Sequence, residues 1–123
     1  MGRVADALRE EVYRANMALA RSGLVMGTFG NVSGVDRGAG LMAIKPSGVP
    51  YDELRPEHIV PVSLSTGEVA GSVLRPSSDT PTHLELYRAF PSCGGVVHTH
   101  SESATALAQA GLPVRCLGTT HAD

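Results

Sequence analysis

The sequence predicts one α/β domain in which antiparallel β-hairpins lie between helices. Residues 4–22 and 81–90 have the apolar spacing of amphipathic helices. Segments 32–44 and 59–70 each contain two apolar runs joined by a short glycine-containing turn, which is typical of a hairpin. No regular strand–helix–strand rhythm is present, so a parallel sheet is not expected.

The composition limits the class of protein. The 123 residues are enough for one domain and too few for two. A formal net charge of −2 creates no field for nucleic acid or an anionic membrane, and an aromatic content of 4% without tryptophan disfavours base stacking. No apolar run approaches the roughly 18 residues of a membrane-spanning helix. No secretory signal is present, and Cys93 and Cys116 make no disulfide framework. We therefore expect a cytoplasmic protein without nucleic-acid or membrane partners.

The first helix is expected to be scaffold without chemistry. Gly23 suits the position just past its end. Its apolar residues recur at helical spacing: Val4, Leu8, Val12, Ala15 and Leu19.

Two small-residue segments have the composition of ligand-binding loops. Residues 27–34 include Gly30 and Asn31, where glycine permits close backbone approach and small polar side chains form hydrogen bonds. Taken alone, this segment slightly favours an irregular turn. After a strand at 41–44, Lys45, Ser47 and Gly48 present a cation, a hydroxyl and a bare amide, which suit a phosphate oxygen but are also common in turns.

A third polar segment precedes the second long helix. Thr80 is the expected N-cap and Pro81 the first helical residue. Ser77, Ser78 and Asp79 lie just before this helix N-terminus, where free amides and the helix dipole favour an anion. Capping explains one or two of these polar residues, but not four in a row. Three residues are expected to form the apolar side of the helix: Leu84, Tyr87 and Phe90.

A pair of histidines ends the next apolar strand. Residues 96–100 read Val-Val-His-Thr-His, and in a strand the side chains of His98 and His100 point to the same face. Both imidazoles then lie close enough to share one ion, which favours a metal or catalytic role over the alternative that two histidines happen to lie near a strand end. A short helix at 104–110 and another strand at 115–117 are expected to follow.

Together these segments predict an enzyme that acts on a phosphorylated small molecule. Two histidines with Asp79 make a workable ligand set for a divalent ion and leave positions open for substrate oxygens. Such an ion acts as a Lewis acid on a carbonyl or enediolate.

Five motifs in order resemble the class II aldolase/epimerase family, and within it most closely the L-ribulose-5-phosphate 4-epimerases. The resemblance runs from the first helix to the last residue. The motifs are Gly-Asn-Val-Ser (30–33), Lys-Pro-Ser-Gly-Val (45–49), Ser-Ser-Asp-Thr-Pro-Thr-His (77–83), Val-Val-His-Thr-His-Ser (96–101) and Gly-Thr-Thr-His-Ala-Asp (118–123).

The resemblance implies a fold and a site. The fold is a three-layer sandwich with a largely antiparallel central sheet between helices, incomplete at its C-terminus. His98 and His100 would be ligands of Zn²⁺ or another divalent metal, with Asp79 at or beside it. Lys45 would lie near the reacting oxygens, and Asp123 would be an acid/base residue working across a subunit interface of a homotetramer. The substrate, chiefly its phosphate, would be held by Gly30, Asn31, Ser47, Gly48, Ser77 and Ser78.

The implied reaction converts L-ribulose 5-phosphate to D-xylulose 5-phosphate in pentose catabolism. It proceeds by retro-aldol cleavage of the C3–C4 bond, rotation of glycolaldehyde phosphate and re-formation of the bond, without a redox cofactor. Asp79, Lys45 and Asp123 favour an epimerase over sugar-phosphate aldolases such as fuculose-phosphate aldolase, which usually carry Glu at position 79. A non-catalytic, adducin-like association module is the other alternative, and the intact His98 and His100 disfavour it.

Family members extend well beyond position 123. Their third zinc histidine and a catalytic tyrosine lie in that further part. We therefore expect this chain to be an N-terminal fragment that is poorly stable and nearly inactive alone.

Overall fold

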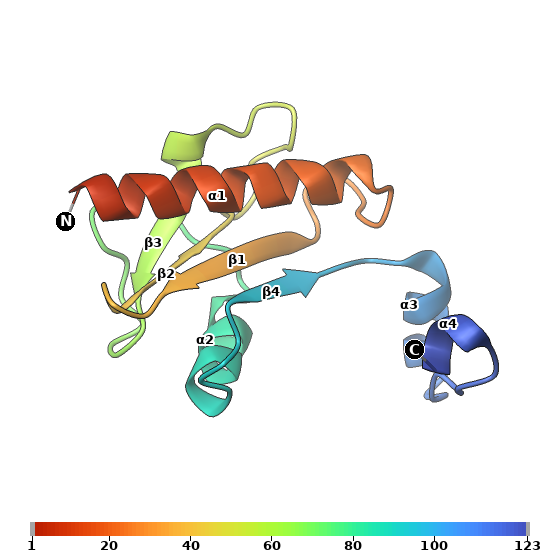
Figure 1. Ribbon diagram of the computed structural model, residues 1–123. Helices are drawn as coiled ribbons and strands as arrows, with labels where there is room; N and C mark the ends of the chain where they lie inside the picture. Colours follow the sequence, from red (N-terminus) through yellow and green to blue (C-terminus); the bar gives the residue numbers. More distant parts are fainter. Residues whose placement is uncertain (1, 123) are drawn as a thin grey trace.

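The computed structural model describes residues 2–122, which form a four-stranded antiparallel sheet with one helix on each face (Figure 1). The strands lie in the order β3-β2-β1-β4. No helix among these residues has the length and apolar character needed to cross a bilayer. The elements are α1 (Gly2–Arg21), β1 (Asn31–Asp36), β2 (Leu41–Ile44), the 3₁₀ turn η1 (Pro56–His58), β3 (Val60–Ser63), α2 (Thr80–Ala89), β4 (Gly95–His98), α3 (Glu102–Gln109) and α4 (Thr119–Ala122).

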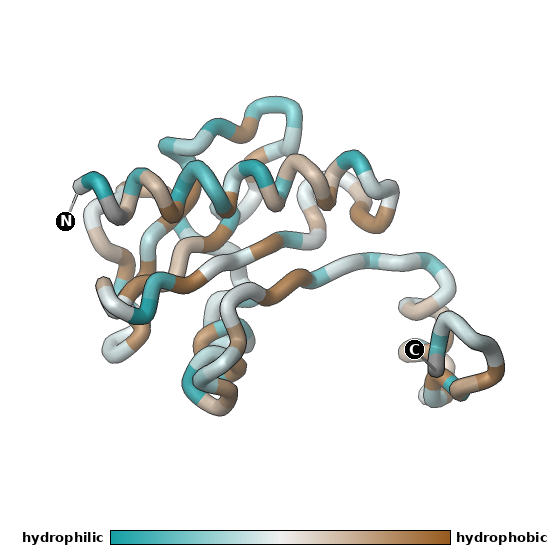
Figure 2. Tube along the Cα trace, viewed as in Figure 1, coloured by the Kyte–Doolittle hydropathy of each residue, from teal (hydrophilic) through white to brown (hydrophobic). Residues whose placement is uncertain are grey.

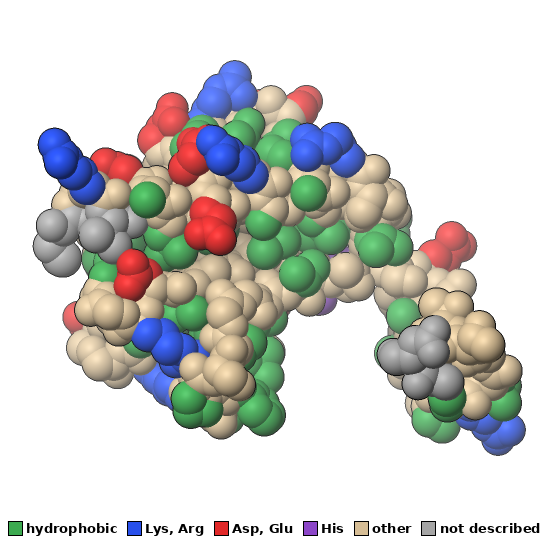
Figure 3. All heavy atoms as spheres, in the orientation of Figure 1, with side chains coloured by type: hydrophobic (Ala, Val, Ile, Leu, Met, Phe, Trp, Pro, Cys, Tyr) green, Lys and Arg blue, Asp and Glu red, His purple; other side chains and the backbone are tan. Residues whose placement is uncertain are grey.

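The sheet separates two apolar layers, because alternate residues of the central strand β2 face opposite sides. Leu41 and Ala43 pack with α1, whereas Met42 and Ile44 pack with α2. Figure 3 shows acidic and basic side chains interspersed over the outer side of α1. The three-layer arrangement with an antiparallel sheet confirms the predicted fold class.

The first predicted hairpin is confirmed. β1 and β2 pair from Ser33↔Ile44 to Asp36↔Leu41, and Gly40 at φ 66° closes the turn. The second hairpin is only partly formed. β3 is an edge strand, a position that tolerates Pro61, and the return segment makes a single bridge to it, Val62↔Val69.

The helix α2 differs from the prediction at both ends. It begins at Thr80 with Asp79 in the N-cap position, because the Ser77 carbonyl accepts hydrogen bonds from the Thr80 amide (3.0 Å) and hydroxyl (2.7 Å) and so forms a turn before the helix. Phe90 was predicted on the apolar side with Leu84, but it is 58% exposed. The helix ends at Ala89, and Phe90 leaves its apolar stripe at φ −122° and ψ 88°.

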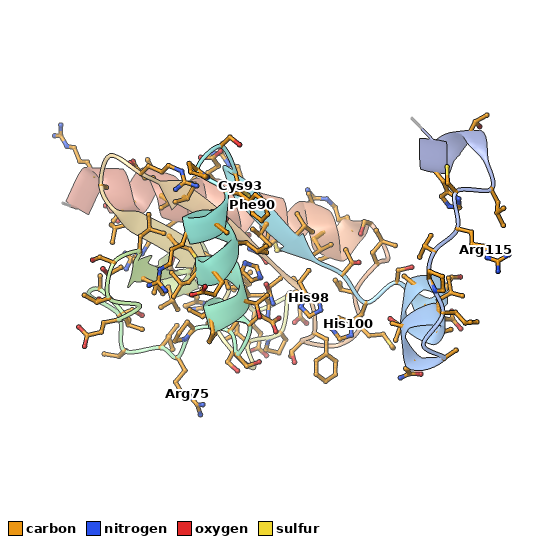
Figure 4. The ribbon with its side chains drawn as sticks, turned by 90° about the horizontal axis from the view of Figure 1, so that it is seen from below. Arg75, Phe90, Cys93, His98, His100 and Arg115 are labelled. Atoms are coloured by element: carbon orange, nitrogen blue, oxygen red, sulfur yellow. The ribbon has the colours of Figure 1, made fainter. Side chains whose placement is uncertain are left out.

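Residues 99–122, here called the C-terminal arm, lead away from the sheet. Figures 1 and 4 both show α3 and α4 apart from the rest of the domain, and Figure 2 shows hydrophobic residues in this outlying part. Leu112, Val114 and Leu117 are all more than half exposed. The strand predicted at 115–117 is wrong, because no neighbouring backbone in residues 2–122 pairs with it.

Candidate active site

The predicted site residues lie at one edge of the sheet. Because neighbouring strands are antiparallel, the start of β1 lies beside the ends of both β2 and β4. The segment before α2 joins this edge through two backbone bonds, from Ser77 N to Lys45 O (3.0 Å) and from Ser47 N to Arg75 O (2.9 Å). Four segments distant in sequence therefore meet at one place.

These segments enclose a pocket of about 330 Å³. Each predicted site residue in the described part of the chain lines it; Asp123 lies outside the described residues. Sequence reasoning did not assign Thr28, Phe29 and Pro46, which also line the pocket and carry no signal that separates them from ordinary loop residues. The predicted residues brought together are Gly30, Asn31, Lys45, Ser47, Gly48, Ser77, Ser78, Asp79, His98 and His100.

A short hydrogen-bonded chain connects Asn31, Asp79 and His98. Asn31 Nδ2 donates to Asp79 Oδ2 at 2.7 Å, and the same oxygen lies 2.6 Å from His98 Nδ1. Burial by itself would raise the pKa of Asp79, but the hydrogen bonds from Asn31 and His98 and the charges of His98 and His83 outweigh it and lower that pKa. An ionised carboxylate only accepts, so His98 Nδ1 carries a proton, and in the neutral imidazole Nε2 is then the nitrogen with the free lone pair.

Asn31 is buried at the pocket wall, 3% exposed, and the nitrogen of its side-chain amide makes hydrogen bonds whereas the oxygen does not. Its Nδ2 also donates to Ser77 Oγ at 3.1 Å, so both N–H groups are used. Its Oδ1 is buried without a hydrogen-bond partner in residues 2–122. An unpaired buried acceptor costs about 1–3 kcal/mol, and a donor on a ligand would remove that cost.

His100 lies beyond the end of β4, contrary to the expectation that both histidines belong to one strand. The β1–β4 pairing ends at Asn31↔His98, and the chain turns at Gly30 (φ 80°), so the ladder with β1 does not reach His100, whose amide instead donates to Leu24 O. The two imidazoles are nevertheless neighbours, with ring centroids 4.8 Å apart (Figure 4).

Lys45 is the single lysine in the sequence and is almost fully buried, 1% exposed. Its Nζ donates to the carbonyls of Val49 (2.8 Å) and Thr28 (3.3 Å) and lies 4.7 Å from the ring centre of Tyr51. Burial lowers the pKa of Lys45 and raises the pKa of Tyr51 to about 12. Lys45 thus connects two walls of the pocket, and its predicted catalytic role stays a prediction.

A buried polar network that sequence reasoning missed supports the site from behind. Ser33 Oγ lies 2.6 Å from His83 Nδ1 and 2.7 Å from the Tyr87 hydroxyl. All three residues are at most 1% exposed. Burial, with a smaller contribution from the charge of His98, lowers the pKa of His83 despite the opposing effect of Asp79. In the sequence, Ser33 is one residue of an alternating strand, and His83 and Tyr87 are spaced i, i+4 on a helix. These patterns could have indicated the network only if the position of α2 on β1 had been known.

Two of the three predicted metal-binding residues fit a metal directly. No group of three His, Cys, Asp or Glu side chains placed to hold a metal occurs within residues 2–122. Asp79 instead holds Nδ1 of His98, the arrangement that orients histidine ligands and fixes their tautomer. The adjacent imidazoles of His98 and His100 therefore fit two ligand positions, and the Asp79 carboxylate holds Nδ1 of His98.

Comparison with known proteins identifies the family. Residues 10–123 match the family model described as Class II Aldolase and Adducin N-terminal domain. The chain belongs to this class II aldolase/adducin family, as its motifs predicted.

Solved structures show the same fold. An L-fuculose 1-phosphate aldolase is 32% identical with a TM-score of 0.82, over 89% of this chain and 51% of its own. YgbL from Escherichia coli, described as a putative aldolase/epimerase/decarboxylase, is 36% identical with a TM-score of 0.74. The match covers 85% of this chain and 49% of YgbL. The L-fuculose-1-phosphate aldolase of Thermus thermophilus is 29% identical with a TM-score of 0.66, over 83% and 50%. The chain spans about half the length of these proteins.

Proposed function

We propose that this chain provides part of the active site of a metal-dependent enzyme that breaks and re-forms a carbon–carbon bond in a phosphorylated sugar. The observation that supports it is one pocket that joins two adjacent imidazoles, a carboxylate that orients one of them, and three small polar segments. The specific reaction that we propose is 4-epimerisation of L-ribulose 5-phosphate.

The histidine side of the pocket would hold a divalent ion such as Zn²⁺. When bound, such an ion supplies Lewis-acid polarisation of a substrate carbonyl oxygen. Asp79 holds His98 in the tautomer whose Nε2 can bind the ion, and Asn31 in turn holds Asp79.

The small polar segments of the pocket would hold the phosphate. The Ser77 and Ser47 amides are committed to backbone carbonyls, and the Asn31 N–H groups are committed to side chains. The hydroxyls of Ser47 and Ser78 donate to no atom of residues 2–122, so we assign them to phosphate oxygens, with Ser78 next to the N-terminus of the ten-residue helix α2.

Lys45 and Asp123 are the residues proposed for proton transfer. Lys45, with its lowered pKa, would sit near the reacting oxygens, and Asp123 would act as an acid or base across a subunit interface of a tetramer. Both roles come from the family resemblance. Because the chain spans about half of its solved relatives, activity and assembly of the whole protein are also proposals.

The choice of an epimerase depends on Asp79, Lys45 and Asp123. At position 79 the aldolases of the family usually have the longer Glu. A class II aldolase acting on a ketose 1-phosphate is the second candidate, and the 32% identity to an L-fuculose 1-phosphate aldolase favours it. An adducin-like association module has no need for His98 and His100 to meet in a pocket, so we do not propose it.

Calorimetric titration of Zn²⁺ into the 123-residue chain tests the metal site. His98→Ala should weaken binding at least about tenfold, since even partners behind a metal ligand contribute 10–100-fold. His121→Ala is the matched control, because His121 is exposed on the C-terminal arm and lies outside the pocket. An equal loss in both variants, or no binding by the wild type, would contradict the proposal.

Incubation of the whole protein, rather than of the 123-residue chain alone, with L-ribulose 5-phosphate separates the two reactions. Formation of D-xylulose 5-phosphate supports the epimerase, whereas net release of free aldehyde supports the aldolase.

A further inference from the structure

The two imidazoles of the pocket are held by different means. His98 Nδ1 donates to the Asp79 carboxylate at 2.6 Å. The ring of His100 makes no hydrogen bond within residues 2–122, and its close neighbours are the rings of His98 and Phe29. Metal-binding histidines normally have one ring N–H held by a carboxylate, a carbonyl or water. A different interaction must therefore orient the His100 ring.

The ring of Phe29 lies over that of His100. Their centroids are 5.3 Å apart and their planes differ by 19°, which is an offset-stacked arrangement. Phe29 is 63% exposed, so burial in the core does not explain its position. A stack covers the face of an imidazole and leaves both nitrogens at its edge accessible.

The backbone around this stack is well supported. The Phe29 amide donates to Met26 O at 2.9 Å, and the Tyr51 hydroxyl donates to Phe29 O at 3.2 Å. The His100 amide donates to Leu24 O at 2.7 Å, which ties the segment after β4 to the loop that carries Phe29. Both stacking partners therefore start from fixed backbone positions.

We propose that Phe29 is a positioning residue that orients His100 for metal binding by aromatic stacking. This inference rests on the proposed function, because it requires that His98 and His100 bind a divalent ion. Phe29 itself contacts neither the ion nor the substrate in this proposal. Its contribution is to restrict the rotation of the His100 ring, as the Asp79 hydrogen bond does for His98.

The stack can be tested in the metal-free chain by NMR. The ring current of Phe29 should shift the carbon-bound protons of the His100 imidazole upfield, and Phe29→Leu should abolish that shift while it keeps apolar bulk in the loop. His100→Gln identifies the resonances. Unchanged His100 proton shifts in Phe29→Leu would overturn the proposed stack whether or not the chain binds a metal.

Calorimetric titration with Co²⁺ tests the positioning role. Phe29→Leu and Phe29→Ala should weaken binding by about 2- to 10-fold, the range that corresponds to one aromatic pair, and Phe29→Trp should restore it. Met26→Ala is the matched control: Met26 is 66% exposed in the same loop, does not line the pocket, and should leave affinity unchanged.

Co²⁺ affinities distinguish the role of Phe29 from the existence of the metal site. Equal Co²⁺ affinities of Phe29→Leu and the wild type would overturn the role of Phe29 and leave the metal site standing. No Co²⁺ binding by the wild type would overturn both. The thermal unfolding midpoint of each variant should equal that of the wild type. If Phe29 had only a structural role, its replacement would lower the midpoint, and Phe29→Trp would not restore the Co²⁺ affinity.

Discussion

Replacing Lys45 with Met is expected to lower the free energy of unfolding by about 2 kcal/mol at neutral pH. The ammonium donates to the carbonyls of Val49 and Thr28, at 2.8 and 3.3 Å. Each buried carbonyl that loses its donor costs about 1–3 kcal/mol, and the contact with the Tyr51 ring adds about 0.5–1 kcal/mol. Burial of an ammonium costs several kcal/mol, and Met does not incur this cost. The net loss of unfolding free energy is therefore smaller than the sum of the lost interactions, about 2 kcal/mol.

The difference in unfolding free energy between the wild type and Lys45→Met should grow as the pH rises. Burial lowers the pKa of Lys45 below its ordinary value of 10.5, so between the folded and unfolded pKa values the unfolded state binds more protons. Stability of the wild type therefore increases with pH across this window, and Lys45→Met lacks that increase. In the folded protein Tyr51 stays protonated throughout this range, because burial raises its pKa to about 12.

Urea unfolding of both proteins from about pH 7 to about pH 10 provides the assay. Lys45 is the only lysine, so the NMR titration of its side chain gives the folded pKa without ambiguity. A difference in unfolding free energy that stays flat or narrows as the pH rises would refute the argument.

Two further substitutions probe the support of the pocket. Tyr87→Phe removes the hydroxyl that lies 2.7 Å from Ser33 Oγ. Urea titration should show an unfolding free energy that is lower by about 1 kcal/mol, and no change would mean that the buried network does not stabilise the fold. Gly30→Ala adds a Cβ that overlaps the Val25 side chain at a residue with φ 80°, whereas Gly27→Ala adds one in open space at φ 56°. Calorimetric melting should therefore show a larger loss for Gly30→Ala than the roughly 1–2 kcal/mol of left-handed strain expected for the Gly27 control, and equal losses would contradict the overlap.

Local patterns predicted much of the fold and the composition of the site. The hairpin from 32 to 44 follows from alternating strands and a glycine turn, and both are local properties. The pairing of His98 with His100 follows from their spacing at a strand end, although His100 falls just beyond the strand. The error at Phe90 has a local cause too, because the helix ends one residue earlier than its apolar spacing suggests.

Contacts between distant segments were beyond the reach of these patterns. No spacing rule connects Asn31 with Asp79, and none indicates that the Asp79 carboxylate holds His98. The stack of Phe29 on His100 was equally hidden, because an aromatic residue in a glycine-rich loop has no periodic signature. Burial of Lys45 against the carbonyls of two loops also depends on how those loops fold over it.

The sequence alone therefore determined which chemical groups the chain offers and the local elements that present them: two histidines after an apolar strand and small polar residues at the ends of strands and before a helix. The tertiary structure decided which groups meet. Antiparallel pairing brings the start of β1 to the ends of β2 and β4, and packing of α2 on the sheet adds Asp79 to the same edge. Hydrogen bonds and ring stacking act only over a few ångströms, so the partners of each side chain emerge only when that edge is assembled.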